Sequence, residues 1–155
     1  MALPQADAVS RLLRDLFGKP VQVKPTAPLA GPTIALLAVY ADAQDTTAAV
    51  VASDLAFAAF GGAALAMIPR SVAEECVKRK RLDDNLRENF YEVVNIMAAT
   101  LNSNDARHHR LVSLVEPAQA PSDARAVLQK PAKRVDFEVS VPDFGVGRLS
   151  MLVCA

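Results

Sequence analysis

The sequence predicts an α+β fold, with an antiparallel sheet built from hairpins and helices packed against it. Two apolar, β-branched runs at residues 33–42 and 46–53 are separated by the polar turn at 43–45, which is typical of a hairpin. Residues 134–155 alternate apolar and polar side chains on both sides of "PDFG", which indicates a second hairpin. A long amphipathic pattern covers residues 84–102. Clustered hairpins favour this fold over a parallel Rossmann arrangement.

The rest of the sequence predicts shorter helices and strands. Pro69 separates two predicted helices: one begins near Leu55 after the capping residues Ser53 and Asp54, and the other is capped by Ser71. Gly61-Gly62 is expected to end the first of these helices or let it bend. The other predicted elements are a helix at residues 6–17 that ends at Gly18, a short strand at 21–23, a strand at 109–117, and a short helix within 121–131 with Ser122-Asp123 as its cap.

Length and composition indicate one globular, cytoplasmic domain over residues 1–155. The formal net charge is zero, which argues against a dedicated nucleic-acid binder. Two cysteines far apart in the chain favour a reducing compartment over a disulfide scaffold. The most apolar stretch, residues 55–69, is interrupted by its glycine pair and is shorter than the roughly 20 apolar residues of a membrane span. We therefore expect no membrane span.

The helix predicted at residues 84–102 has two faces. At about 100° per residue, an apolar stripe is formed by Leu86, Phe90, Val93, Met97 and Leu101, with Val94 at its border. Roughly opposite lie Glu88, Glu92, Asn95, Ala99 and Asn102, which we expect to be exposed. Glu92 and Asn95 are neighbours at i and i+3. On these residues alone, a solvated helix face explains the pattern.

Other chemistry-bearing residues have structural interpretations. The basic run Lys78–Arg81 is expected to complement the negative end of a helix dipole rather than to bind nucleic acid. His108-His109 beside Asp105 is expected to be a surface loop, since adjacent side chains do not generally converge on one metal ion. Neither cysteine has a histidine at a spacing that suggests a thiol nucleophile.

The order of elements resembles the CheX/CheC phosphatase family of bacterial chemotaxis. The segments that carry the resemblance are "TIALLAVYADAQDTTAAVVASDLAFAAFGG" and, later, "YEVVNIMAATLN". In that family a hairpin feeds a Ser-capped helix that ends in a glycine pair, and a long helix carries Glu-x-x-Asn. The resemblance covers roughly residues 6–152. One such motif occurs here, as in CheX, whereas CheC-type members typically have two.

The resemblance implies a phosphatase that docks on a phosphorylated response regulator of the CheY type. Asn95 would insert its carboxamide into the partner's site and orient the attacking water, and Glu92 would pair with a lysine of the partner. We expect Glu88, Ala99 and Asn102 to complete the docking face. The aspartyl phosphate and its Mg²⁺ would belong to the partner, so no cofactor is expected on this chain. A homodimer is also implied, and the Ala-rich segment 55–68 is expected to leave apolar surface for a partner.

Two alternatives remain open at this stage. Family members usually have small residues immediately before the Glu and the Asn, where this chain has Tyr91 and Val94. Bulk at these positions favours a non-catalytic adaptor, related to FliM/FliN-type domains, that binds a response regulator or a flagellar partner. In the other alternative, the Glu92/Asn95 pair is incidental to a scaffold.

Overall fold

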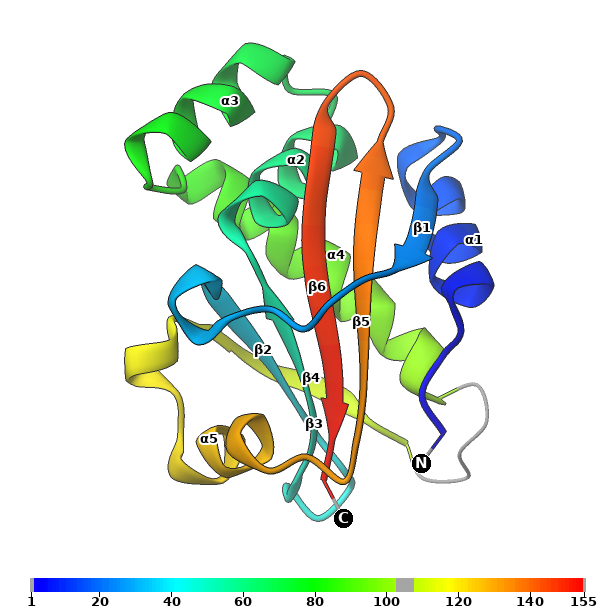
Figure 1. The fold of residues 1–155 in the computed structure, drawn as a ribbon, viewed down its shortest axis with the longest axis vertical. Coiled ribbons are helices and arrows are strands. Elements are labelled where there is room, and N and C mark those ends of the chain that lie inside the picture. Colours follow the sequence, from blue (N-terminus) through cyan, green and yellow to red (C-terminus); the bar gives the residue numbers. More distant parts are fainter. Residues whose placement is uncertain (1, 103–107, 155) are drawn as a thin grey trace.

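One six-stranded antiparallel sheet organises the chain. The computed structural model describes residues 2–102 and 108–154. The strands are β1 (Gln22–Pro25), β2 (Leu36–Ala41), β3 (Thr47–Ser53), β4 (Arg110–Val115), β5 (Lys133–Val141) and β6 (Gly145–Val153). They lie in the order β1-β5-β6-β3-β2-β4, and every neighbouring pair is antiparallel (Figure 1). The predicted α+β class is confirmed.

Both predicted hairpins are present. In the first, β2 and β3 pair from Leu36 opposite Ser53 to Ala41 opposite Thr47, with an irregularity after Tyr40. In the second, β5 and β6 pair up to Val141 opposite Gly145, so "PDFG" forms the turn. β3 and β6 then join the two hairpins into one sheet.

The described residues form five α-helices: α1 (Ala6–Phe17), α2 (Leu55–Leu65), α3 (Arg70–Arg79), α4 (Asp84–Asn102) and α5 (Ser122–Gln129). Of these, α3 packs mainly on α2 rather than on the sheet. Short 3₁₀ turns lie at Gly31–Thr33 and Pro117–Gln119. In Figure 1, α4 crosses behind the sheet and α5 lies in front of it. Gly18 ends α1 as predicted: it adopts the left-handed conformation with φ 66°, and its N–H donates to the Arg14 carbonyl.

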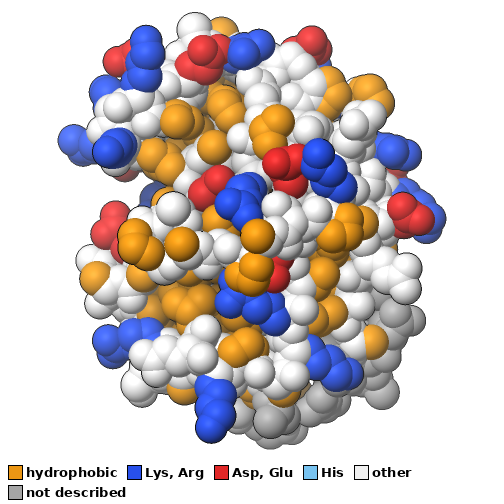
Figure 2. Space-filling view, in the orientation of Figure 1, with side chains coloured by type: hydrophobic (Ala, Val, Ile, Leu, Met, Phe, Trp, Pro, Cys, Tyr) orange, Lys and Arg blue, Asp and Glu red, His pale blue; other side chains and the backbone are white. Residues whose placement is uncertain are grey.

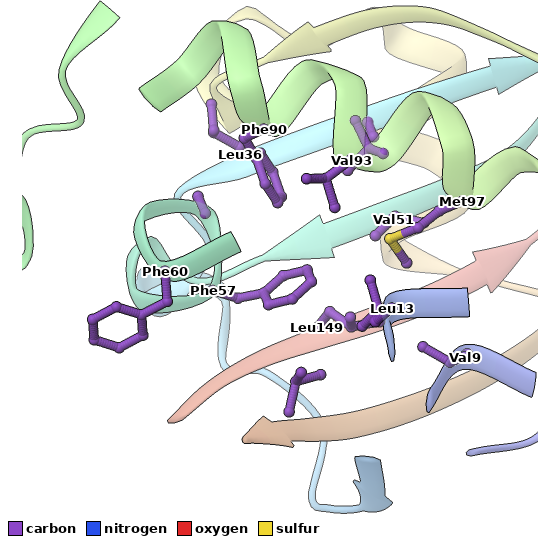
Figure 3. Packing of buried hydrophobic residues seen from close by; sticks show 14 of the residues in the cluster. Val9, Leu13, Leu36, Val51, Phe57, Phe60, Phe90, Val93, Met97 and Leu149 are labelled. Carbon is purple, nitrogen blue, oxygen red and sulfur yellow. The ribbon is translucent and has the colours of Figure 1, made fainter. Parts of the chain in front are cut away.

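The core has two parts because β2, β3 and β6 bury side chains on both of their faces. The larger cluster joins alternate strand residues to α1, α2 and α4, and includes Leu13, Val51, Phe57, Phe90 and Leu149 (Figure 3). The ring of Phe57 meets that of Phe90 edge-on, with centroids 5.6 Å apart. The intervening strand residues point the other way and form the smaller cluster with α5. Figure 2 views the molecule from this α5 side.

Several local predictions about helix ends are wrong. Asp54 alone caps α2, by accepting from the Phe57 N–H at 2.8 Å. Ser71 lies inside α3, whose N-cap position is Pro69. Ser122 likewise lies inside α5 and forms no cap, because Pro121 holds the N-cap position. In both helices a proline's restricted backbone sets the start without a side-chain hydrogen bond.

The glycine pair does not end α2, which continues through Gly61-Gly62 to Leu65. The expectation that segment 55–68 leaves apolar surface is also wrong for residues 57–64, all of which are buried inside this chain. Near the end of the segment Ala66 and Met67 are exposed, Met67 at 87%. Among the described residues, no helix combines the length and the apolar character that crossing a membrane requires.

Candidate functional site

The exposed face of α4 is held in place by a buried face of the same helix. All five residues of the predicted apolar stripe are buried: Leu86, Phe90, Val93, Met97 and Leu101. Val94 is buried as well, and its carbonyl accepts a 2.6 Å hydrogen bond from the Tyr40 hydroxyl on β2. Burial raises the pKa of Tyr40, so the hydroxyl stays protonated and remains a donor. This bond lies one residue before Asn95.

Two further hydrogen bonds fix α4 to its neighbours. The Asn89 carboxamide donates to the Gly62 carbonyl of α2 at 3.1 Å. The Arg87 guanidinium donates to the Leu114 carbonyl at the end of β4, at 2.7 Å. Together with the Tyr40 bond, these contacts join α4 to three other elements, so the residues on its outer face have a rigid support.

Four of the five predicted site residues lie exposed along one line of α4: Glu88, Glu92, Asn95 and Ala99. Glu92 and Asn95 are one turn apart, a spacing that brings Cβ atoms within about 5–6 Å. Among residues 2–102 and 108–154, no hydrogen bond or ion pair engages the side chains of Glu88, Glu92 or Asn95. Their carboxylates and carboxamide are therefore available to an external molecule.

Asn102, the fifth predicted site residue, is instead half-buried and bonded within the chain. Its carboxamide donates to the His109 carbonyl at 2.9 Å and accepts from the His109 N–H at 2.8 Å. Its Oδ1 also lies 3.0 Å from the His109 Nδ1. Asn102 thus connects the end of α4 to the residue before β4, and its contact with a partner stays a prediction.

The predicted surface loop at His108-His109 is right for only one of the two histidines. His108 is exposed, but His109 is buried at 1% exposure. Asp105 lies outside the described residues. Within the part of the chain that the structure describes, no group of three or more His, Cys, Asp or Glu side chains could hold a metal ion.

The two bulky residues beside the motif differ in their positions. Val94 is fully buried, so the expectation that it adds bulk at the exposed face is wrong. Tyr91 is 37% exposed and does border the face. Sequence reasoning also missed Ile96, which is 38% exposed directly after Asn95. It lines a groove of about 480 Å³ with Leu12 and Leu16 of α1 and with Ala99.

The site's chemistry suits contact with another macromolecule. A carboxamide can donate through its N–H₂ and accept through its oxygen, and a carboxylate can accept from a cation. These groups stand on an outward-facing helix, and the described residues place no nucleophile–base pair beside Asn95. Asn has no usable basicity, so it can orient a water but cannot act as a general base.

No protein-family model matches the sequence, and no curated protein matches it. Solved structures do. A chain of the FliM–SpeE complex from H. pylori aligns with a TM-score of 0.67 and 10% identity, over 96% of this chain and 81% of the other. The FliM middle domain from H. pylori aligns with a TM-score of 0.61 and 12% identity, over 96% of this chain and 84% of the other. A chain of the CheX–CheY–BeF₃–Mg²⁺ complex from Borrelia burgdorferi aligns with a TM-score of 0.53 and 15% identity, over 96% of this chain and 94% of the other.

The chain has the CheX- and FliM-like fold. This agrees with the predicted arrangement of hairpins, helices and one long motif-bearing helix. Identities of 10–15% show the shared architecture alone. The same architecture occurs in a CheX–CheY complex and in FliM complexes with SpeE and FliG, so proteins of this fold assemble with more than one kind of partner.

Proposed function

We propose that this chain docks on a phosphorylated receiver domain of the CheY type and promotes hydrolysis of its aspartyl phosphate. The observation that carries the proposal is the Glu92/Asn95 pair. It is exposed, has no partner within the described residues, and is held on a helix fixed to three other elements. The fold, which CheX shares in a complex with CheY, supports the same assignment.

In this proposal each motif residue has one task. Glu92 pairs with a lysine of the receiver domain and sets the position of α4. Asn95 enters the receiver's site, where its carboxamide orients the attacking water while staying uncharged beside the anionic phosphoryl group. Phosphoryl transfer depends mainly on positioning and electrostatic support, so a neutral orienting group suffices. Mg²⁺ remains on the receiver.

The direct test is the dephosphorylation rate of CheY-type receiver domains from the same genome, with and without this protein. We expect Asn95→Ala to reduce the acceleration by about 100-fold, on the scale of losing one well-placed hydrogen-bonding group. Glu75→Gln, which changes an exposed carboxylate on α3, serves as the surface control and should keep wild-type activity. Equal rates for the wild type and Asn95→Ala would refute the catalytic role.

A second candidate is a non-catalytic adaptor that uses the same helix face to bind a response regulator or a flagellar partner. The specific observation in its favour is Tyr91, an exposed aromatic ring immediately before Glu92. FliM middle domains share the fold, and a FliM–FliG complex contains the same architecture. Binding that depends on phosphorylation but gives no turnover would favour the adaptor over the phosphatase.

We also propose a homodimer that pairs through the sheet, which is what the resemblance to CheX-type proteins implies, now without the support of segment 55–68. The sheet face beyond α5 carries charged side chains of β5 and β6, including Asp136, Glu138 and Arg148, and charged groups are visible over this area in Figure 2. Light scattering at micromolar concentration is the test, and a monomeric mass would contradict the proposal.

A further inference from the structure

A second groove lies beside the Glu92/Asn95 pair, on the side of α4 that faces the end of β4. It encloses about 480 Å³ and is lined by Arg87, Glu88, Asn89, Tyr91, Glu92 and Leu114. Two of its polar side chains are already engaged, because Arg87 donates to the Leu114 carbonyl and Asn89 to the Gly62 carbonyl. These bonds hold the Arg87 and Asn89 side chains in place along the groove.

The remaining polar groups of the groove are two carboxylates and a phenol. Glu88 and Glu92 stand at i and i+4, a spacing at which like charges repel each other on a helix. Neither carboxylate forms an ion pair with any described residue. Glu92 is assigned to the receiver lysine, and Arg87 is directed to the Leu114 carbonyl. Glu88 is therefore the carboxylate of the groove that remains to bind a further cation.

The apolar groups of the groove select the shape of that cation. Tyr91 presents a partly exposed ring, and Leu114 adds an aliphatic surface from the end of β4. A Lys or Arg side chain can lay its methylene stem along such surfaces while its charged head meets a carboxylate. A cation close to an aromatic face gains further attraction. A small inorganic cation would leave these apolar walls uncovered.

We propose that this groove receives a second cationic side chain, Lys or Arg, of the docked receiver domain, with Glu88 binding its head and Tyr91 covering its stem. This inference rests on the proposed docking function and adds a specificity site to it. The second cation lies outside the reacting centre and is separate from the lysine assigned to Glu92. Tyr91, which departs from the family pattern, thus selects partners that carry a long cation at this position.

The test is the affinity for receiver domains activated with BeF₃⁻ and Mg²⁺, measured by isothermal titration calorimetry. We expect Glu88→Gln to weaken binding about 2–5-fold, Tyr91→Ala about 3–10-fold, and the charge reversal Glu88→Lys by at least about 10-fold. Tyr91→Phe should retain affinity, since the ring carries the contact. Glu75→Gln is the matched carboxylate control. The Glu88→Gln loss should shrink at 0.5 M salt, because screening weakens exposed ion pairs.

The outcomes separate this inference from the proposed function. If Glu88→Lys and Tyr91→Ala bind the receiver as the wild type does, while Asn95→Ala still loses activity, the cation site is wrong and the phosphatase stands. If the wild type binds no activated receiver domain and accelerates no dephosphorylation, both proposals fall. In steady-state dephosphorylation, the Glu88 and Tyr91 variants should raise KM, whereas Asn95→Ala should lower kcat.

Discussion

At the scale of single residues, the Tyr40–Val94 hydrogen bond connects the core to the candidate site. Tyr40→Phe removes the hydroxyl and leaves the buried Val94 carbonyl without this donor. We expect a loss of about 1–3 kcal/mol in the free energy of unfolding, the cost of an unsatisfied buried polar group. Urea denaturation followed by circular dichroism measures it. Tyr91→Phe is the control, because Tyr91 is 37% exposed and its hydroxyl has no hydrogen bond within the described residues; this variant should unfold like the wild type.

Residue exposure on α4 could largely be predicted, because helical periodicity fixes which side chains share a face. It correctly placed Glu88, Glu92 and Asn95 outside and Phe90 inside. Periodicity could not show the partners that come from other elements. The bond between Asn102 and His109 depends on where β4 begins, so a residue that the wheel left exposed became a structural link.

At the scale of elements, the contact between α2 and α4 explains why the glycine pair lies within a helix. A Cβ on Gly62 would lie 2.5 Å from the Leu86 carbonyl oxygen, whereas a Cβ on Gly61 would meet nothing closer than the Phe17 ring at 3.7 Å. We expect Gly62→Ala to destabilise the fold by about 1–3 kcal/mol through this clash. Gly61→Ala should be neutral or stabilising by up to about 1 kcal/mol through helix propensity.

Thermal denaturation of the two alanine variants measures this difference, and Gly61→Ala provides the matched control. Equal melting temperatures for the two variants would contradict the close approach. The sequence shows the same residue at both positions, so the two glycines could not be told apart without the position of α4. That is why "GG" was expected to end or bend the helix.

The start of α2 gives a pH-dependent prediction. Burial raises the pKa of the Asp54 carboxyl, against the opposing effect of hydrogen bonds from the Phe57 and Arg148 N–H groups and the Arg148 charge. The folded state therefore keeps this proton to a higher pH than the unfolded state. From about pH 4, the ordinary value for Asp, upward to the raised pKa, the stability contributed by Asp54 falls as pH rises.

Asp54→Asn carries no titrating group at this position. The unfolding free energy of the wild type minus that of Asp54→Asn should therefore decrease as the pH rises from about 4. Urea denaturation of both proteins over this rise in pH is the measurement. A difference that stays constant or increases with pH would contradict the assignment.

At the scale of the whole molecule, the hairpins were predictable and their assembly was not. Alternating side chains and turn residues specify which strands pair locally. The order β1-β5-β6-β3-β2-β4 depends on contacts between segments far apart in the sequence, such as β3 with β6. The position of α5 on the face opposite α4 follows from residues such as Val50 and Leu152, which point away from the larger core.

A sheet whose strands β2, β3 and β6 contribute to both cores should unfold as one cooperative unit. Val93 belongs to the larger core on α4, and Val50 to the smaller core under α5. We expect Val93→Ala and Val50→Ala each to lower the free energy of unfolding by about 1–3 kcal/mol, through lost burial and a cavity. Both should shift the same single transition. Calorimetry, together with circular dichroism in the far and near ultraviolet, is the measurement. A separate transition that moves in only one variant would show that the two cores unfold independently. The strands that both cores share would then not couple them.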